Sequence, residues 1–133
     1  MATATAAQAR HAAKSEYDAY LANCPSRQLL DRISDKWVSL ILVALGDGSR
    51  RYSELARELA GVSQKMLTQT LRALERDGLI DREVTASVPV RVDYSLTELG
   101  RSLLPILRAV KVWSEHNMDD VTAARARYDS RAH

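Results

Sequence analysis

The sequence predicts a mainly α-helical domain of the α+β class, with one small β-hairpin. Three observations lead to this prediction. Apolar residues recur at helical spacing along most of the chain, residues 79–96 change to strict alternation around a short connector, and a glycine-containing turn joins two helical segments just before that change. At 133 residues, with 46% hydrophobic and 27% charged side chains, the chain is one domain with a modest core.

Residues 1–22 form the first predicted helix, which is rich in alanine and frayed at its start. Tyr17, Tyr20 and Leu21 lie at helical spacing within it. A single amphipathic helix beside a small domain needs a surface to cover. We expect that surface to be either the domain's own core or a partner subunit.

A proline separates this helix from the next. Pro25 disfavours helical geometry at Cys24 and suits the first position of a new helix, over residues 26–33. Cys24 would then be the N-cap residue, where helix N–H groups and the helix dipole favour a thiolate. The alternative is that this lone cysteine is only a small, well-packed residue. A buried helix over residues 35–45 follows.

Two further helices indicate a helix-turn-helix. A short helix ends at a turn containing Gly61, and a second one runs from Ser63 to Gly78 with its leucines on one side. Polar side chains that can reach base edges and phosphates occupy the other side. A solvated helix face is the alternative, but the neighbouring elements favour contact with DNA. The candidate DNA-reading residues are Ser63, Gln64, Lys65, Thr68, Gln69 and Arg72.

The alternating segments 79–85 and 90–96 predict a β-hairpin, or wing, directly after that helix. Arginines near the wing and near the preceding helix are candidates for contacts with phosphates or the minor groove, against the alternative of surface solubility. These are Arg50, Arg51, Arg82 and Arg91. The net charge is only +2, and eight bases face six acids between residues 49 and 91, so the position of the bases carries this prediction. Residues 23–96 are thus predicted as a winged helix-turn-helix, DNA-binding core.

The last predicted helix spans residues 97–118 and has more apolar surface than one small domain covers. We therefore expect a homodimer built from the N- and C-terminal helices. The predicted interface residues of this helix are Leu103, Ile106, Leu107, Val110 and Trp113, which join Tyr17, Tyr20 and Leu21. Residues 119–133 lose the apolar pattern and are predicted to be a flexible tail.

Together these segments resemble the HxlR-type winged helix-turn-helix family of bacterial transcriptional regulators, relatives of the MarR regulators. The resemblance runs from about Cys24 to Trp113. Ser34-Asp35 stands where the family often has two glycines. The segments that carry it are Cys24-Pro25, Asp35-Lys36-Trp37, Arg51-Tyr52-Ser53-Glu54-Leu55, the stretches 61–68 and 71–80, and the stretch 92–100.

The resemblance implies a homodimer that places two recognition helices in successive major grooves of double-stranded, pseudo-palindromic operator DNA. Family members are repressors or activators, and we expect a repressor. Several members sense electrophiles or oxidants through a cysteine at the position of Cys24. With no second cysteine in the chain, oxidation of Cys24 would end as a sulfenate, a mixed disulfide with a small thiol, or a bridge between subunits.

Two alternatives stay open. The same DNA-binding fold could respond to a small apolar effector held between Trp37 and the dimer helices. A winged helix that binds protein and no DNA is the other. The three histidines lack ligand-spaced partners, so no metal is expected; no catalytic pairing or phosphate loop indicates an enzyme or a cofactor. With no apolar run of the roughly 20 residues that span a bilayer, we expect no membrane partner and a cytoplasmic location.

Overall fold

The computed structural model describes residues 5–131, apart from the side chains of residues 21 and 22. The predicted class is confirmed: the chain is mostly helical, with a small antiparallel sheet of three strands. In chain order the elements are α1 (Ala6–Asn23), α2 (Pro25–Ile33), α3 (Lys36–Leu45), β1 (Arg50–Arg51), α4 (Tyr52–Glu58), α5 (Gln64–Arg76), β2 (Ile80–Thr85), β3 (Arg91–Leu96), α6 (Glu98–Ser102) and α7 (Leu104–Arg131).

The core lies where α3, α4 and α5 meet the base of the sheet. Its fully buried side chains come from each of these elements and include Ile41, Leu55, Leu67 and Ile80. The strand order is β1-β3-β2, and β2 pairs with β3 over six positions, from Ile80 opposite Leu96 outward. This packing fixes α5 and the hairpin as neighbours on one compact body.

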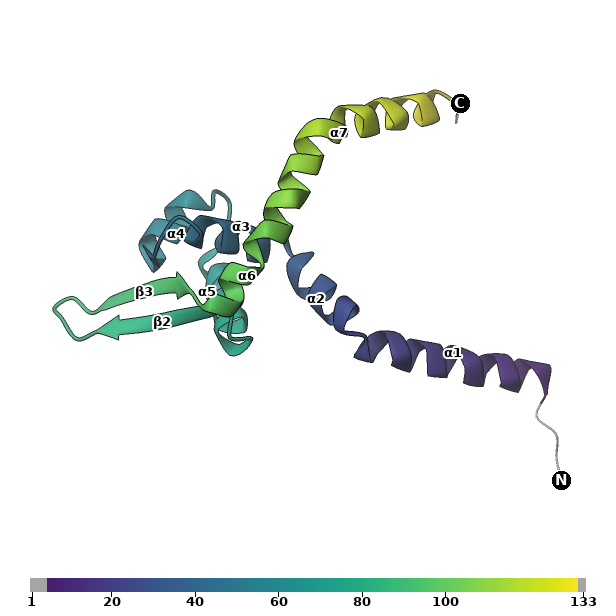
Figure 1. The fold of residues 1–133 in the computed structure, drawn as a ribbon, viewed down its shortest axis with the longest axis horizontal. Helices are drawn as coiled ribbons and strands as arrows, with labels where there is room; N and C mark the ends of the chain where they lie inside the picture. The colour runs from purple at the N-terminus through teal and green to yellow at the C-terminus, as the bar shows by residue number, and fades with distance from the viewer. Residues whose placement is uncertain (1–4, 132–133) are drawn as a thin grey trace.

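Two helical arms leave this body (Figure 1). The N-terminal arm is α1, in which residues 6–20 are all exposed. The C-terminal arm is residues 108–131 of α7, in which no residue is buried. Both arms extend to one side of the winged domain, while the β2–β3 hairpin extends to the opposite side. None of the described helices is both long and apolar enough to span a membrane.

The C-terminal region differs from the prediction in two ways. The helix expected over 97–118 is divided into α6 and α7 at Leu103, because Pro105 has no N–H for a continuous helix and instead occupies the second position of a new one. The predicted flexible tail, 119–133, is wrong for its described part, since α7 continues to Arg131. Apolar periodicity predicts which residues are buried, whereas a helix can also form in solvent, and residues 123–127 at the centre of this stretch are alanines and arginines, which have high helix propensity.

The predicted interface residues divide into two groups. Leu103 and Leu107 are buried in the chain's own core, so their assignment to a dimer interface is wrong. The helix α7 packs against α3, and the apolar residues at the start of α7 belong to the core that the two helices share. The exposed group, between 47% and 69% accessible, consists of Tyr17, Tyr20, Ile106, Val110 and Trp113. The side chain of Leu21 lies outside the described residues.

Candidate nucleic-acid interface

The helix α5 forms where the sequence predicts it, with its leucines on the inner side. The Ser63 hydroxyl caps it by accepting from the Met66 N–H at 3.0 Å. Gly78 ends it in the left-handed region, with φ of +75°. Leu67, Leu71 and Leu74 are buried at its inner side, which fixes the rotation of the helix about its axis.

The outer side of α5 presents a polar surface to solvent. Five of the six predicted DNA-reading residues are exposed there: Ser63, Gln64, Lys65, Gln69 and Arg72. Residues four apart lie on the same helix face, so these side chains form one continuous strip along the first two and a half turns. Thr68 is half-buried, and its hydroxyl lies 3.3 Å from the hydroxyl of Tyr52.

Tyr52 links α4 to α5 by hydrogen bonds that the sequence did not predict. Its hydroxyl donates a hydrogen bond to the backbone carbonyl of Gln64 at 3.2 Å, in addition to its contact with Thr68. Tyr52 is the first residue of α4, so it joins the start of the first helix to the first turns of the second. Its acceptor is a backbone carbonyl, which leaves no signal in the sequence. We infer that Tyr52 sets the angle at which α5 is presented.

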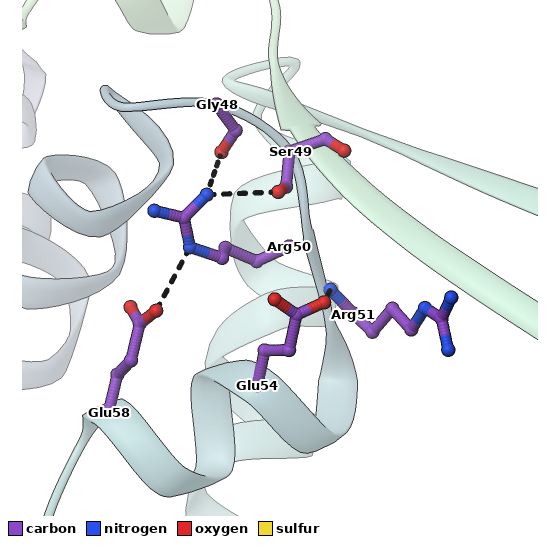
Figure 2. A network of polar contacts seen from close by, with 6 residues as sticks. All are labelled: Gly48, Ser49, Arg50, Arg51, Glu54 and Glu58. Carbon is purple, nitrogen blue, oxygen red and sulfur yellow. Dashed lines mark hydrogen bonds and ion pairs between the residues drawn. The ribbon is translucent and has the colours of Figure 1, made fainter.

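Arg50 and Arg51 have different surroundings (Figure 2). Arg50 Nε donates to the Glu58 carboxylate at 2.9 Å, and its Nη1 donates to the carbonyls of Gly48 and Ser49 at 3.3 and 3.1 Å. The backbone N–H of Arg51 donates to Glu54 at 3.2 Å, whereas its guanidinium points away from this cluster. Arg50 therefore holds the turn before α4, and Arg51 presents its charge to solvent.

The two wing arginines are also unequal. Arg91 Nε donates to Asp93 at 2.8 Å, and this hydrogen bond lowers the pKa of the Asp93 carboxyl and raises the pKa of Arg91. Arg82 lies opposite Tyr94, nearer the base of the hairpin than its tip, and makes no ion pair within the described chain. Arg91 is therefore paired with a carboxylate, and Arg82 lies away from the wing tip. Neither supplies a free positive charge at the tip.

Cys24 occupies the predicted N-cap position of α2, followed by Pro25 in the first turn. The backbone N–H of Arg27, and next that of Ser26, lower the pKa of its thiol from the ordinary value. Cys24 lies half-buried in a shallow depression whose other walls come from α1, including Glu16 and Tyr20. Its thiol therefore loses its proton more readily than an ordinary cysteine thiol.

A helix-turn-helix with a solvent-facing polar second helix, followed by a β-hairpin wing, defines a DNA-binding protein of the winged helix-turn-helix class. The comparisons with known proteins agree. The chain belongs to the HxlR-like helix-turn-helix family, whose model matches residues 32–122. The resemblance predicted from the sequence is thereby confirmed, and the chain is a DNA-binding transcriptional regulator. This is not a family of enzymes.

Individual relatives cover most of the chain. The uncharacterized HTH-type transcriptional regulator YtfH of Escherichia coli (strain K12) is 44% identical over 117 residues, which are 88% of this chain and 90% of that protein. The redox regulator HypR in its reduced form superposes with a TM-score of 0.72 at 42% identity, covering 75% of this chain and 99% of that one. The reduced transcriptional regulator YodB from B. subtilis has a TM-score of 0.63 at 32% identity, covering 71% and 94%.

Proposed function

We propose that this chain is a homodimeric repressor whose two α5 helices bind pseudo-palindromic operator DNA, and that oxidation of Cys24 controls its binding. The observation that carries the proposal is the exposed polar strip of α5, which Tyr52 holds beside the wing. Because its target is chromosomal DNA, we place its action in the cytoplasm.

The two arms support the homodimer. Tyr17 and Tyr20 on α1, and Val110 and Trp113 on α7, are each more than half exposed. Within each arm these side chains are three residues apart on one helix face, and exposed apolar side chains grouped in this way mark an interaction site. A second copy of the chain would cover both arms symmetrically, and the half-sites should then lie about one helical turn, roughly 10–10.5 bp, or a multiple of it apart.

The exposed strip of α5 supplies the proposed base contacts. Gln64 and Gln69 have the amide groups that pair with adenine, and Lys65 and Arg72 have the cations that pair with guanine or phosphate. Ser63 and Thr68 lie beside these four side chains at the start of the helix, and the Thr68 hydroxyl is held by its contact with the Tyr52 hydroxyl. Among the other arginines, Arg51 and Arg82 are the proposed phosphate contacts, since Arg50 and Arg91 already bind carboxylates.

Selection of bound sequences from random DNA, followed by titration of the selected operator, tests this function. Arg72→Ala should weaken operator binding and reduce the slope of log K against log salt by about one unit. Arg101→Ala is the matched control, because it removes the same charge from an exposed site on α6, outside both arms and outside the strip on α5. A wild-type protein that selects no DNA would support the protein-interaction alternative and overturn the proposal.

The redox part of the proposal depends on the lowered pKa of the Cys24 thiol. HypR was solved in reduced and oxidized forms, and YodB in reduced and diamide-treated forms. In this chain, diamide would take two electrons and two protons as Cys24 joins a second thiol in a disulfide. That second thiol belongs either to a small molecule or to the partner's Cys24.

The helix α2 supplies a path from the thiol to the DNA-binding surface. Cys24 is its N-cap residue, and near its other end Arg32 forms an ion pair with Asp77, the C-cap residue of α5. Leu29 and Ile33 pack against the core but are only partly buried, so α2 has no fully buried side chain to fix its position. We therefore propose that a disulfide at Cys24 displaces α2 and, through Arg32, shifts α5.

Diamide titration of the operator complex tests this control. Wild-type protein should release DNA, and Cys24→Ser should stay bound. Undiminished release from the Cys24→Ser protein would overturn the thiol mechanism and favour the apolar effector instead. A non-reducing gel separates the two disulfide products, because only the intersubunit bridge doubles the apparent mass.

A further inference from the structure

Asp93 lies in a row of charged residues across the three-stranded sheet, and the function described so far does not use it. On the sheet it is directly opposite Arg51 of β1 on one side and Glu83 of β2 on the other. Arg91, two residues earlier on β3, lies on the same face, because side chains alternate along a strand. Asp93 therefore has cations on two sides and an acid on the third.

Pairing between the strands does not by itself favour an acid at this position. Like charges directly opposite each other on neighbouring strands are destabilising, and Asp93 faces Glu83 in this way. Asp93 is nonetheless kept charged, because the hydrogen bond from Arg91 Nε at 2.8 Å, and further the charge of Arg51, lower the pKa of its carboxyl. The Asp93 side chain is 19% exposed, against 47% for Arg91. It is a well-covered anion placed against an exposed cation.

Arg91 and Arg51 lie where a DNA backbone would pass. Both line one groove between the start of α4 and the wing. A second groove shares Tyr52 and Ser53 with the first and continues to Gln64 at the start of α5. Because a sugar-phosphate strand bounds each side of a major groove, a helix that lies in that groove has phosphates beside it. The groove that holds the two arginines is one of the surfaces next to α5.

A DNA phosphate and the Asp93 carboxylate are alternative partners for Arg91. Both are oxyanions that accept hydrogen bonds from a guanidinium, and Asp93 already occupies Arg91 Nε. An arginine contributes to DNA affinity by neutralising a phosphate and releasing its counterions. While Arg91 is paired with Asp93, it does not make this contribution.

We propose that Asp93 competes with DNA phosphate for Arg91, and that by holding Arg91 it limits the sequence-independent part of DNA binding. This inference rests on the DNA-binding function proposed above and deepens it. Phosphate contacts add affinity but carry no sequence information, whereas the side chains of α5 are placed to read bases. A weaker hold on phosphate leaves a larger share of the binding free energy to α5.

Asp93→Asn in the full-length protein tests this inference. With one more arginine free to meet a phosphate, it should bind both the selected operator and unrelated DNA about fivefold more tightly at about 0.15 M salt. The slope of log K against log salt should steepen by about one unit. Glu83→Gln is the matched control, because it removes the same charge directly across the strands from a residue without an ion pair in the described chain. It should leave the slope nearly unchanged.

Arg91→Gln shows whether Asp93 acts through Arg91. In the wild-type background it should change DNA affinity by less than about twofold, since Arg91 is already paired. In the Asp93→Asn background it should abolish both the gain in affinity and the steeper slope. A change in sheet stability alone would not produce this dependence on Arg91.

Three results would overturn the inference while leaving the proposed function intact, since in each the wild-type protein binds its operator. Asp93→Asn could gain no more affinity than Glu83→Gln. The gain could persist when Arg91 is also replaced, which would assign it to the charge of Asp93 alone. Arg91→Gln by itself could lose much affinity, which would show that Arg91 already binds DNA in the wild type. A wild-type protein that selects no DNA would instead refute the proposed function itself.

Discussion

Gly100→Ala is the substitution that most directly tests the packing between the wing and the C-terminal helices. Gly100 is buried in α6, and a methyl group there would overlap the backbone carbonyl of Leu79, with the Leu79 carbonyl carbon at 3.0 Å and Leu96 Cδ2 at 3.3 Å. The Leu79 oxygen also accepts the Thr97 N–H at 3.1 Å. Leu96 Cδ2 is the end of a side chain and can shift, but the Leu79 carbonyl is backbone and cannot move away in the same manner.

The expected cost has two parts. Overpacking a core position costs about 1–3 kcal/mol, and losing the Thr97–Leu79 hydrogen bond adds about 1 kcal/mol. The sum, about 2–4 kcal/mol, is a large fraction of the free energy of unfolding of a typical small domain, which is about 5–15 kcal/mol. We therefore expect a lower melting temperature, by roughly 4 °C for each kcal/mol.

Thermal unfolding followed by circular dichroism, at fixed protein concentration, measures this effect. Gly78→Ala is the matched control, because its φ of +75° strains an alanine although the described residues leave open space for the methyl. It should cost only about 1 kcal/mol. Equal melting temperatures for the two variants would refute the steric argument, because backbone conformation would then explain both.

Three further predictions concern the DNA-binding surface and its control. Tyr52→Phe should lower operator affinity severalfold in a gel shift while costing only about 1 kcal/mol in stability, because it removes the tie to α5 but keeps the ring; an unchanged affinity would contradict this. Arg32→Gln should bind the operator as wild type does but release less DNA when diamide is added, since the ion pair with Asp77 is lost. A wild-type response to diamide would show that this ion pair does not transmit the effect of Cys24 oxidation to α5. Cys24 should react with iodoacetamide down to a lower pH in the folded protein than in urea, because helix N–H groups stabilise the folded thiolate and its pKa is lowered; identical pH profiles would disprove it.

Patterns confined to a few neighbouring residues could be predicted well from the sequence. The cap at Ser63, the stop at Gly78 and the buried leucines of α5 all depend on residues within the same helix. The alternation of residues 79–85 and 90–96 likewise predicted the hairpin, whose strands pair as β2 and β3. Local geometry decides these features, so local sequence reports them.

Features that depend on distant partners could not be predicted in the same way. Tyr52 binds a carbonyl twelve residues away, and the Arg50–Glu58 ion pair joins a strand to the end of a helix. The apolar residues of the predicted helix over 97–118 follow one continuous helical spacing. Nothing in that spacing shows that Leu103 and Leu107 belong to the core while Trp113 stays exposed. Such assignments need the path of the chain in space.

Ion pairs within the chain determine which arginines near the DNA-binding core keep a free charge. Arg32, Arg50 and Arg91 each bind a carboxylate in the same chain, so these three add little to the positive field there. Lys65 and Arg72 on α5 make no ion pair within the described residues, so their charge stays directed at the surface that meets DNA. A field focused on one surface attracts a polyanion even when the net charge is low. The internal ion pairs therefore neutralise Arg32, Arg50 and Arg91, whereas Lys65 and Arg72 on α5, together with Arg51 and Arg82, keep their charge for a polyanion.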